Sequence, residues 1–433
     1  MQSTYLIEDT LVVQGGDSYI VYSPFSGKIA RVFSFPEKGT EIFLSLHESG
    51  FFNALPESTR KDDIETWRGF RSLTLLVTRS CNLACIYCYA AAKKSGRTMS
   101  LNLALQSLKW FAEQFKGNTI RISFHGGGEP TLEFALIQEV VKEAYYLAQK
   151  SSKKTRFQIV TNGTASIGIF DWFIDNNFGI SISADGPAFI QNRNRPFVNG
   201  KGSSEIVEKN IRYLVSRNYP FTIRLTFSSI DDIREIVRYF GNLGVKSLHV
   251  EPLFPHGREY KRVIFGKESE KEVYSPDGKE FVTSFFKAMG VAREFGIRIT
   301  NSHIGHLTKG LGYFCGSASG RSMIVTDEGF ISGCLEVVDD QDSDFEMFQL
   351  GGFSSEKNTF VVNEAALARF QNRHSSILLP CKNCFARYVC SGGCAVKAVR
   401  VSGNFMGRDL PYCIFTKMLI PAIVKKIARL SGV

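Results

Sequence analysis

The sequence predicts an α/β protein with a parallel central sheet, a small α+β unit before it and a cysteine-rich unit after it. Six short apolar runs alternate with amphipathic segments between Ser72 and about Arg298, as in a parallel sheet wound with helices. Seven of the ten cysteines crowd into the stretch from Cys315 to Cys413, where long-range periodicity is weak. A length of 433 residues is enough for about three domains at ~150 residues each.

The composition excludes several classes of protein. Hydrophobic residues make up 44% of the chain and charged residues 22%, which is ordinary for a folded protein and rules out global disorder. The first residues lack a secretory signal, and the apolar run Met418–Val424 is far short of the ~18 residues of a membrane span. We therefore expect a cytoplasmic protein without membrane partners, whose ten cysteines bind metals rather than form disulfides.

The formal charge of +10 fits an acidic partner. The basic residues are spread along the chain, however, and no basic stripe is interleaved with aromatic residues. We therefore expect no nucleic-acid partner.

Residues 1 to about 70 predict strands followed by a helix. Strand-like runs at Tyr5–Val13, Tyr19–Tyr22 and Lys28–Phe33 are separated by glycine and proline turns. Helical spacing follows at Thr40–Ser49, and the polar stretch Pro56–Thr66 has the composition of a linker.

The central unit alternates strands with helices. The predicted strands are Leu73–Thr78, Thr119–Phe124, Phe157–Thr161, Gly179–Ser183, Phe221–Phe227 and Ser247–Pro252. Helices are predicted between them, at Leu101–Phe115, Phe134–Gln149, Ser204–Val215 and Asp232–Leu243. The pattern alone fits an open sheet or a partial barrel, and in either case functional groups belong at the carboxyl ends of the strands. Beyond residue 310 we expect order to depend on metals more than on an apolar core.

Three cysteines follow the first central strand with the spacing Cys-x3-Cys-x2-Cys: Cys81, Cys85 and Cys88. An iron–sulfur cubane normally takes four thiolates, so three of them leave one iron open, much as catalytic metal sites keep a free position. A structural zinc site that borrows a distant ligand is the alternative, because spacing alone does not fix the metal.

A glycine-rich turn follows the second central strand, at Gly126-Gly127-Gly128-Glu129-Pro130. Consecutive glycines let the backbone approach a ligand closely, and Pro130 suits the first turn of a helix. At this strand end the carboxylate of Glu129 could meet a ligand ammonium group. The alternative is a simple turn between strand and helix.

Together the two motifs resemble those of the radical S-adenosylmethionine (SAM) superfamily, in the expected order and on the expected elements. The resemblance implies a partial (β/α)6 TIM-type barrel over residues 71–305 and a [4Fe–4S] cluster on the first three cysteines. It further implies that the methionine part of SAM chelates the open iron. One-electron cleavage then gives methionine and a 5′-deoxyadenosyl radical, which abstracts hydrogen from a substrate.

The resemblance also suggests residues that contact the cofactor. Tyr87 matches the aromatic position before the third cysteine, and the glycine turn would meet the amino group of SAM. Strand-end residues would meet the ribose, and arginines would meet the carboxylate, although a salt bridge is an equally good explanation for each arginine. The candidates are Tyr87, Gly127, Gly128, Glu129, Asn162, Ser183, Arg195 and Arg224.

The remaining seven cysteines resemble the SPASM extension of radical SAM enzymes that modify peptides and proteins, although four of them seen alone would fit a zinc site. The resemblance implies two auxiliary [4Fe–4S] clusters, one on Cys381, Cys384, Cys390 and Cys413 and one on Cys315, Cys334 and Cys394. Some family members supply another cysteine shortly after the first, but residues 316–321 contain none. The three-cysteine cluster therefore takes an oxygen or nitrogen ligand, or stays open to a substrate thiolate.

The resemblance narrows the substrate to peptides. The first hypothesis is a maturase that installs a thioether (C–S) or C–C crosslink in a ribosomally made precursor, with residues 1–70 as a winged-helix-like domain that binds the leader. Its further partners would be an electron donor such as flavodoxin or ferredoxin, and the chain would be a monomer. The proton acceptor stays open: Asp185 and Glu251 end core strands and are candidates, as are several other residues.

Two alternatives remain. An anaerobic sulfatase-maturating enzyme, which forms formylglycine, would begin almost directly at the first cysteine motif and carry an Asp after the second cysteine of the extension. Here about seventy residues come first, and Leu335 follows Cys334. A non-catalytic iron–sulfur carrier or sensor would need neither the glycine turn nor an open iron.

Overall fold

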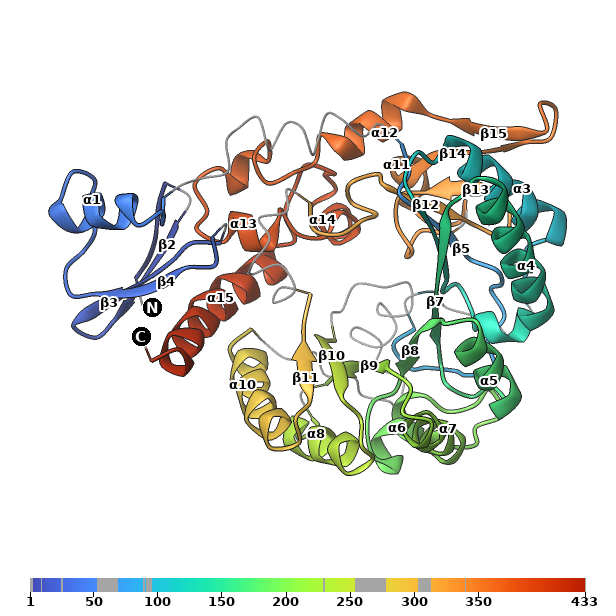
Figure 1. The fold of residues 1–433 in the computed structure, drawn as a ribbon, viewed down its shortest axis with the longest axis horizontal. Coiled ribbons are helices and arrows are strands. Elements are labelled where there is room, and N and C mark those ends of the chain that lie inside the picture. The colour runs from blue at the N-terminus through green and yellow to red at the C-terminus, as the bar shows by residue number, and fades with distance from the viewer. Residues whose placement is uncertain are drawn as a thin grey trace.

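The computed structural model describes residues 3–8, 10–24, 26–52, 69–88, 90, 96–228, 230–253, 278–302, 313–338 and 340–432. Its main feature is an eleven-stranded sheet with the order β11-β10-β9-β8-β7-β6-β5-β12-β13-β14-β15. The strands from β11 to β12 are parallel, and those from β12 to β15 are antiparallel. Neither end strand pairs with the other, so the curved sheet is an open, partial barrel (Figure 1).

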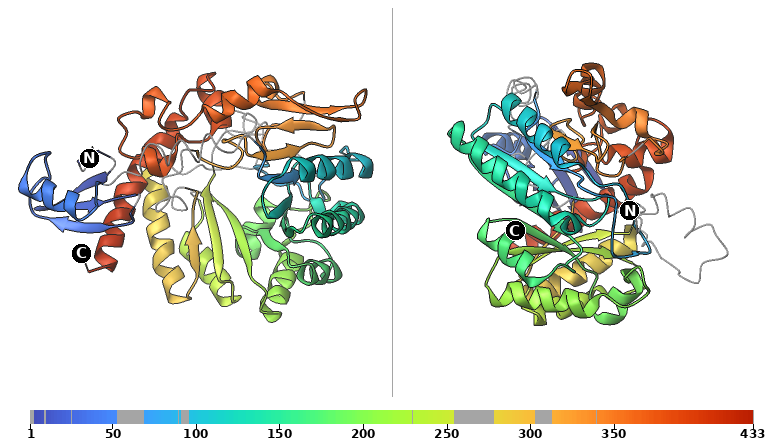
Figure 2. Two further views of the ribbon diagram at one scale, coloured as in Figure 1. Left: turned by 45° about the horizontal axis from the view of Figure 1, so that its top comes forward. Right: turned by 90° about the vertical axis from the view of Figure 1, so that its right-hand side faces the viewer.

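The parallel part confirms the α/β fold predicted from the sequence. Its strands are β5 (Ser72–Leu75), β6 (Thr119–Phe124), β7 (Lys154–Thr161), β8 (Gly179–Ser183), β9 (Phe221–Phe227), β10 (Ser247–Pro252), β11 (Arg298–Thr300) and β12 (Ser322–Val325). The helices that cover its outer face are α3 (Leu101–Gln114), α4 (Phe134–Lys150), α5 (Ile167–Asp175), α6 (Ala188–Asn194), α7 (Ser204–Ser216), α8 (Ile233–Asn242) and α10 (Gly278–Glu294) (Figure 2). Buried apolar residues alternate with more exposed ones in β6, β7, β9 and β10, and the strands from β5 to β10 were predicted from such short runs.

The C-terminal region continues the sheet and lies across the open side of its curve (Figure 1). Its strands are β13 (Phe330–Ser332), β14 (Gln349–Ser354) and β15 (Thr359–Val362). Its helices are α11 (Phe345–Phe348), α12 (Glu364–Gln371), α13 (Arg387–Cys390), α14 (Ala395–Ser402) and α15 (Leu410–Leu430), with a 3-10 turn at Leu379–Cys381.

This region also has an apolar core, which the sequence did not predict. Phe348, Phe370 and Phe405 form a buried aromatic cluster with ring centroids 4.7–5.8 Å apart. Buried residues of α14 and α15 belong to the same contiguous core as the parallel sheet. The sequence hid this core because its members lie on short helices separated by turns, where no long period develops.

The N-terminal unit is a four-stranded antiparallel meander followed by a helix: β1 (Thr4–Ile7), β2 (Thr10–Gly15), β3 (Ser18–Tyr22), β4 (Ile29–Val32) and α1 (Glu41–Glu48). The run predicted as one strand over Tyr5–Val13 is two strands, because the chain turns at Glu8, where φ is +51°. One face of this sheet packs on α1, and the other joins α15 near the C-terminus (Figure 1). The predicted linker Pro56–Thr66 lies outside the described residues.

No helix among the described ranges is long and apolar enough to cross a membrane.

Candidate functional site

A cavity of about 500 Å³ opens at the carboxyl ends of β5 to β10, where the C-terminal region faces the sheet. Two sets of thiols line it, Cys81, Cys85 and Cys88 from the loop after β5 and Cys315, Cys334 and Cys394 from the C-terminal region. The structure thus brings together cysteines that are more than 200 positions apart in the sequence. The other predicted site residues that line this cavity are Tyr87, Gly127, Gly128, Glu129, Asn162, Ser183, Arg195 and Arg224.

The first cysteine loop is held by the glycine turn that follows β6. The backbone N–H of Gly128 donates to Thr78 O at 2.8 Å, and that of Glu129 donates to Ser80 O at 2.8 Å. A Cβ atom on Gly128 would lie 1.9 Å from Ser80 O, and Gly127 has a φ of +92°. Both positions therefore require glycine, and together they fix where the cysteine loop leaves the sheet.

The thiols of this loop have the surroundings of metal ligands. Burial raises the pKa of Cys81 to about 11 and that of Cys85 to about 12, and a negative charge on Cys88 would raise both. Donors nevertheless point at the sulfurs: Leu83 N lies 3.4 Å from Cys81 Sγ, and Arg195 lies 4.0 Å from Cys85 Sγ. Three partly buried thiols in one loop, two of them beside N–H donors, fit an iron–sulfur cluster that converts them to thiolates.

Arg195 and Tyr87 form a buried group with Asp185 beside the first cysteines. Arg195 Nε lies 3.1 Å from Asp185 Oδ2, the Tyr87 hydroxyl donates to the same carboxylate, and the Arg195 guanidinium stacks 5.2 Å from the Tyr87 ring centroid. Burial would lower the pKa of Arg195, but negative charges on Asp185, Tyr87 and Cys85 and the hydrogen bond to Asp185 together raise it. Arg195 therefore forms a salt bridge within the protein, which was the alternative to a cofactor contact, although its side chain also lines the cavity.

The Glu129 carboxylate also has partners within the protein. It accepts hydrogen bonds from Thr161 Oγ1 at 2.7 Å, from Asn162 N at 2.6 Å and from the hydroxyl and N–H of Thr131 at 2.7 and 3.1 Å. Burial raises the pKa of Glu129, and these bonds oppose that shift. The carboxylate thus joins the ends of β6 and β7, which leaves the glycine backbone as the more accessible part of the turn.

The other predicted cofactor residues differ in how freely they face the cavity. The Asn162 amide donates to Asn82 Oδ1 at 2.8 Å and accepts from Thr164, so it stabilises the loops. Ser183 and Arg224 are register neighbours on β8 and β9, and Arg224 is exposed toward the cavity. His125, which the sequence analysis did not single out, also lines the cavity. Burial, reinforced by the positive charge of Arg224, lowers the pKa of His125 to about 3.

The other seven cysteines fall into two groups by mutual proximity. Negative charges on Cys394 and Cys315 would raise the pKa of Cys334, which burial already places well above its usual value. In the second group, burial raises the pKa of Cys413 to about 11, and charges on Cys381 and Cys384 would raise it further. Charges on those three cysteines would likewise raise the pKa of Cys390. The two groupings are those that the SPASM resemblance implied.

The three-cysteine group has no fourth thiol nearby but several polar neighbours. Ser317, Glu336 and Lys397 line the cavity beside these cysteines, and Glu336 Oε2 is paired with Arg400 at 2.8 Å. Within the described part of the chain, no three or more His, Cys, Asp or Glu side chains are arranged to hold a single metal ion.

The structure separates the two candidate proton acceptors. Asp185 is 0% exposed, does not line the cavity and receives bonds from Tyr87, Asn194 and Thr226 besides its ion pair. Glu251 lines the cavity at the end of β10, together with His249 on the same face of that strand. A strand period of two places both side chains in the site, so the pair could have been read from the sequence once this strand end was known to face the cavity.

Glu251 is positioned by its neighbours. His249 Nε2 lies 3.0 Å from Glu251 Oε1, and Ser302 N donates to the same oxygen at 2.7 Å. The Oε2 atom receives a longer bond of 3.3 Å from Asn301. On its other side, His249 Nδ1 lies 3.1 Å from the hydroxyl of Thr300 on β11.

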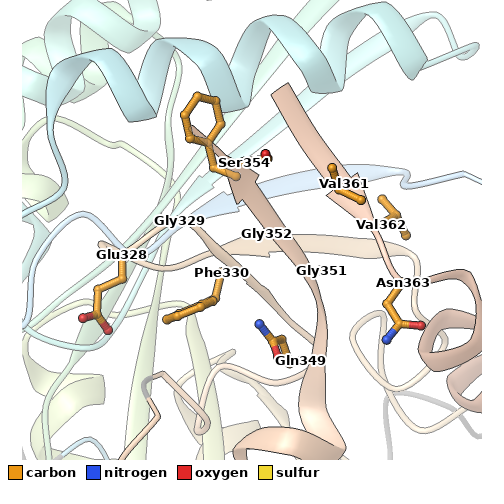
Figure 3. Close-up of a pocket in the computed structure, with 11 residues that line it drawn as sticks. Glu328, Gly329, Phe330, Gln349, Gly351, Gly352, Ser354, Val361, Val362 and Asn363 are labelled. Atoms are coloured by element: carbon orange, nitrogen blue, oxygen red, sulfur yellow. The ribbon is translucent and has the colours of Figure 1, made fainter. Parts of the chain in front are cut away.

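A second cavity, of about 380 Å³, lies over the antiparallel strands β13 to β15 (Figure 3). Gly329, Gly351 and Gly352 line it, and Glu328 is the one titratable residue among its lining residues. Glu328 is itself paired with Arg79, 2.6 Å away. With no cysteine or histidine in its lining and its carboxylate already paired, this hollow offers much less chemistry than the cavity between the cysteines.

Residues 75–240 match the family model described as the radical SAM superfamily. The chain is 34% identical over 195 residues to the uncharacterized protein MJ0907 of Methanocaldococcus jannaschii, which covers 44% of this chain and 66% of that protein. It thus spans slightly less than two thirds of that relative, and 48% of the uncharacterized protein sll1766 of Synechocystis. The radical SAM cyclopropyl synthase TigE of Paramaledivibacter caminithermalis is 24% identical over 440 residues, or 94% of this chain and 84% of TigE.

Two groups of solved structures share the fold. The structure titled native anSMEcpe with bound AdoMet has a TM-score of 0.64 and 20% identity, and the match covers 83% of this chain and 99% of that one. Streptococcus suis SuiB bound to its precursor peptide SuiA has a TM-score of 0.53 and 13% identity, with 94% of this chain and 99% of that one covered. At these identities the likeness concerns the fold.

Proposed function

Because residues 75–240 form a radical SAM domain, we propose that this chain is an enzyme that cleaves SAM reductively and uses the resulting 5′-deoxyadenosyl radical to modify a peptide. The observation that carries the proposal is the single cavity lined by Cys81, Cys85 and Cys88 on one side and by Cys315, Cys334 and Cys394 on the other. A bound cluster on the first set would supply the reductive cleavage, and a cluster on the second would accept an electron. A substrate between them would contact both.

Residues that line the cavity would bind SAM and accept a proton from the substrate. The backbone of Gly127 and Gly128 would hold the amino group of SAM, and Arg224 would pair with its carboxylate. Ser183, one strand away in register, is the candidate for the ribose. Asp185 and Arg195 would fix Tyr87 and Cys85, and Glu251 would accept the proton that the substrate releases.

We further propose that the peptide is a ribosomally made precursor and that the product is an intramolecular C–S or C–C crosslink. The near full-length similarity to a cyclopropyl synthase and the fold likeness to a structure that holds a precursor peptide support this choice. Residues 1–70 would bind the leader by strand addition to an edge of the β1–β4 sheet. The core would span residues 71–305 and the two-cluster SPASM domain residues 306–433. We expect a cytoplasmic monomer that receives electrons from a flavodoxin or ferredoxin.

Formylglycine formation is the second candidate. A cysteine-type anaerobic sulfatase-maturating enzyme of Clostridium novyi is 31% identical over 159 residues, although these cover only 33% of this chain. Leu335 occupies the position after Cys334 where those enzymes carry Asp, which favours crosslinking.

The test is anaerobic reconstitution with iron and sulfide, followed by dithionite, SAM and each short peptide encoded beside the gene. The expected products are 5′-deoxyadenosine and a peptide that has lost two hydrogens per crosslink and does not react with an aldehyde probe. An aldehyde-reactive peptide would favour formylglycine formation. A sample that contains iron but releases no 5′-deoxyadenosine would overturn the enzyme proposal and favour a carrier or sensor.

A further inference from the structure

Arg373 is a buried cation between the two C-terminal cysteine groups. It follows α12, its side chain is 1% exposed, and its guanidinium donates to four backbone carbonyls. The acceptors are Phe405 O at 2.6 Å, Gly393 O at 2.9 Å, Gly407 O at 3.3 Å and Gly392 O at 3.4 Å. Gly392 and Gly393 are part of the short link between Cys390 and Cys394, which belong to different groups.

The carbonyls satisfy the hydrogen bonds of Arg373 but do not neutralise its charge. Across the described residues, no carboxylate forms an ion pair with it. Burial lowers the pKa of Arg373, and negative charge on Cys394, Cys381, Cys390 and Cys315, two from each cysteine group, would raise it. A buried charge without a counter-charge is strongly unfavourable, so this arrangement requires negative charge on the cysteines.

We propose that Arg373 is the shared counter-ion of the two auxiliary iron–sulfur centres and raises the reduction potential of both. The inference rests on the proposed function, in which these cysteines hold [4Fe–4S] clusters. A cluster held by thiolates carries net negative charge, and the electron it accepts adds to that charge. A fixed cation in a medium of low dielectric constant stabilises the reduced form of each centre. Arg373 is thus a positioning and tuning residue that touches neither SAM nor the peptide.

This role fits the reaction proposed for the cavity. After hydrogen abstraction, the substrate radical forms its new bond while one proton leaves to Glu251 and one electron leaves to an iron–sulfur centre. Uptake of that electron makes or breaks no bond at the centre. Its driving force depends on the potential of the acceptor, which Arg373 would set for the centre beside the cavity and for the one behind it.

Arg369 is a matched control. It lies on α12, its side chain is exposed, and it donates to Met347 O at 2.6 Å. Its guanidinium lies 5.4 Å from the ring centroid of Phe405, and that of Arg373 lies 5.8 Å from the same ring. The two arginines therefore share an aromatic neighbour, but only Arg373 is buried between the thiols.

The experiment measures the potentials of the two auxiliary centres. A full chain in which Cys81, Cys85 and Cys88 are replaced by Ala removes the first cluster, so that only auxiliary signals remain. Arg373→Met, Arg373→Gln, Arg373→Lys and Arg369→Met are added separately. Each reconstituted protein is titrated with dithionite in the presence of mediators and followed by electron paramagnetic resonance.

Loss of the charge in Arg373→Met and Arg373→Gln should lower both potentials by about 59 mV or more, a tenfold change in a one-electron equilibrium. Arg373→Lys should retain most of the wild-type potentials, and Arg369→Met all of them. If Arg373→Met does not fold, Arg373→Gln, which still donates hydrogen bonds, is compared with Arg373→Lys. Unchanged potentials in an iron-loaded Gln variant, or a shift in one centre only, would overturn the proposal. A parent protein without iron–sulfur signals would instead overturn the proposed function.

Discussion

At the scale of single residues, Glu251 is the group in the cavity best placed to take up a proton. Its Oε1 atom is held by His249 and Ser302 and its side chain is 26% exposed, whereas Glu129 is 2% exposed and Glu336 is paired with Arg400. Glu251→Gln keeps the shape of the side chain but removes the acceptor. We expect about 10²-fold less crosslinked peptide, because a positioned base typically contributes that much or more. Release of 5′-deoxyadenosine should change by less than about threefold, since it precedes proton loss.

The measurement is the ratio of crosslinked peptide to 5′-deoxyadenosine, determined by mass spectrometry. Glu294→Gln, on the exposed surface of α10, serves as the control. Glu251→Asp should recover part of the crosslinking, and added formate should partly rescue Glu251→Ala. A Glu251→Gln enzyme that crosslinks as efficiently per 5′-deoxyadenosine as the wild type would exclude the role of base.

His125 makes the stability of the site depend on pH. Burial and the charge of Arg224 lower the pKa of His125 from 6.5 to about 3, so the folded chain holds this side chain neutral. The unfolded chain binds a proton first as pH falls below 6.5, and the stabilisation is lost progressively toward pH 3. Between pH 7 and pH 5 we expect the free energy of unfolding to fall by about 2 kcal/mol from this group. The wild type should lose this amount relative to His125→Gln in denaturant titrations, and the exposed His47→Gln should behave as the wild type.

At the scale of elements, the meeting of two loops fixes the first cysteine site. The N–H groups of Gly128 and Glu129 bond to the loop that carries Cys81, and a Cβ on Gly128 would overlap Ser80 O. Gly128→Ala should therefore push the cysteine loop away, at a cost of about 1–3 kcal/mol for the overlap. We expect loss of the iron bound by the first three cysteines and of SAM cleavage.

The control for this change is Gly168→Ala in α5, where an added Cβ would meet no atom within 4 Å. Alanine suits a helix better than glycine, so this variant should be as stable as the wild type or slightly more so. Iron analysis and the 5′-deoxyadenosine assay compare the two variants. A Gly128→Ala protein with full iron content and normal cleavage would contradict the overlap.

The elements of the parallel core were predictable because each strand is a short apolar run with a polar or glycine end. Strands β6, β8, β9 and β10 have the bounds expected from the sequence. Two parallel strands, β11 and β12, were not predicted. Strand β12 pairs with β5 although about 250 residues separate the two, and a single short run carries no sign of its partner. The turn at Glu8 was also missed. Turns with positive φ are recognised in a sequence by glycine or asparagine, and here the position is occupied by Glu8.

At the scale of the whole molecule, the sequence predicted which cysteines would gather but not how the groups share one cavity. The spacing of the cysteines and the family resemblance predicted three groups of cysteines. The contact between the strand ends of β5–β10 and the C-terminal region could not be predicted, because it depends on tertiary packing. Arg79 contributes to that contact, because it precedes the first cysteines and pairs with Asp327 at 2.7 Å and with Glu328 at 2.6 Å in the turn between β12 and β13. Neither this link nor the His249–Glu251 pair could be predicted from the local sequence. The partners of Arg79 lie about 250 residues away along the chain, and the His249–Glu251 pair becomes a candidate site only once its strand end is known to face the cavity.

The extent of the apolar core predicts how the protein responds to removal of iron. The apolar core is continuous from the parallel sheet into α14 and α15, so the fold does not depend on the metal alone. Burial raises the pKa of Cys394 and of Cys413 to about 11, so without metal both are neutral thiols at pH 7. Arg373 then loses its counter-charges, and the segments that hold it should loosen. Chelated, metal-free protein should keep its α/β circular dichroism. Amide exchange should increase by about tenfold, equivalent to ~1.4 kcal/mol of local stability, in residues 379–394 and 405–413.

Hydrogen–deuterium exchange read by mass spectrometry checks this localisation. The variant with Ala at Cys81, Cys85 and Cys88, loaded with iron, is the control, because it lacks only the first cluster and should keep residues 379–394 protected. Peptides from β6 and β9 report on the parallel core and should exchange as in the iron-loaded wild type. If those strands exchanged as fast as the cysteine segments after chelation, the metal centres would be holding the whole fold together. The continuous apolar core would then be too weak to act as the main source of stability that its burial implies.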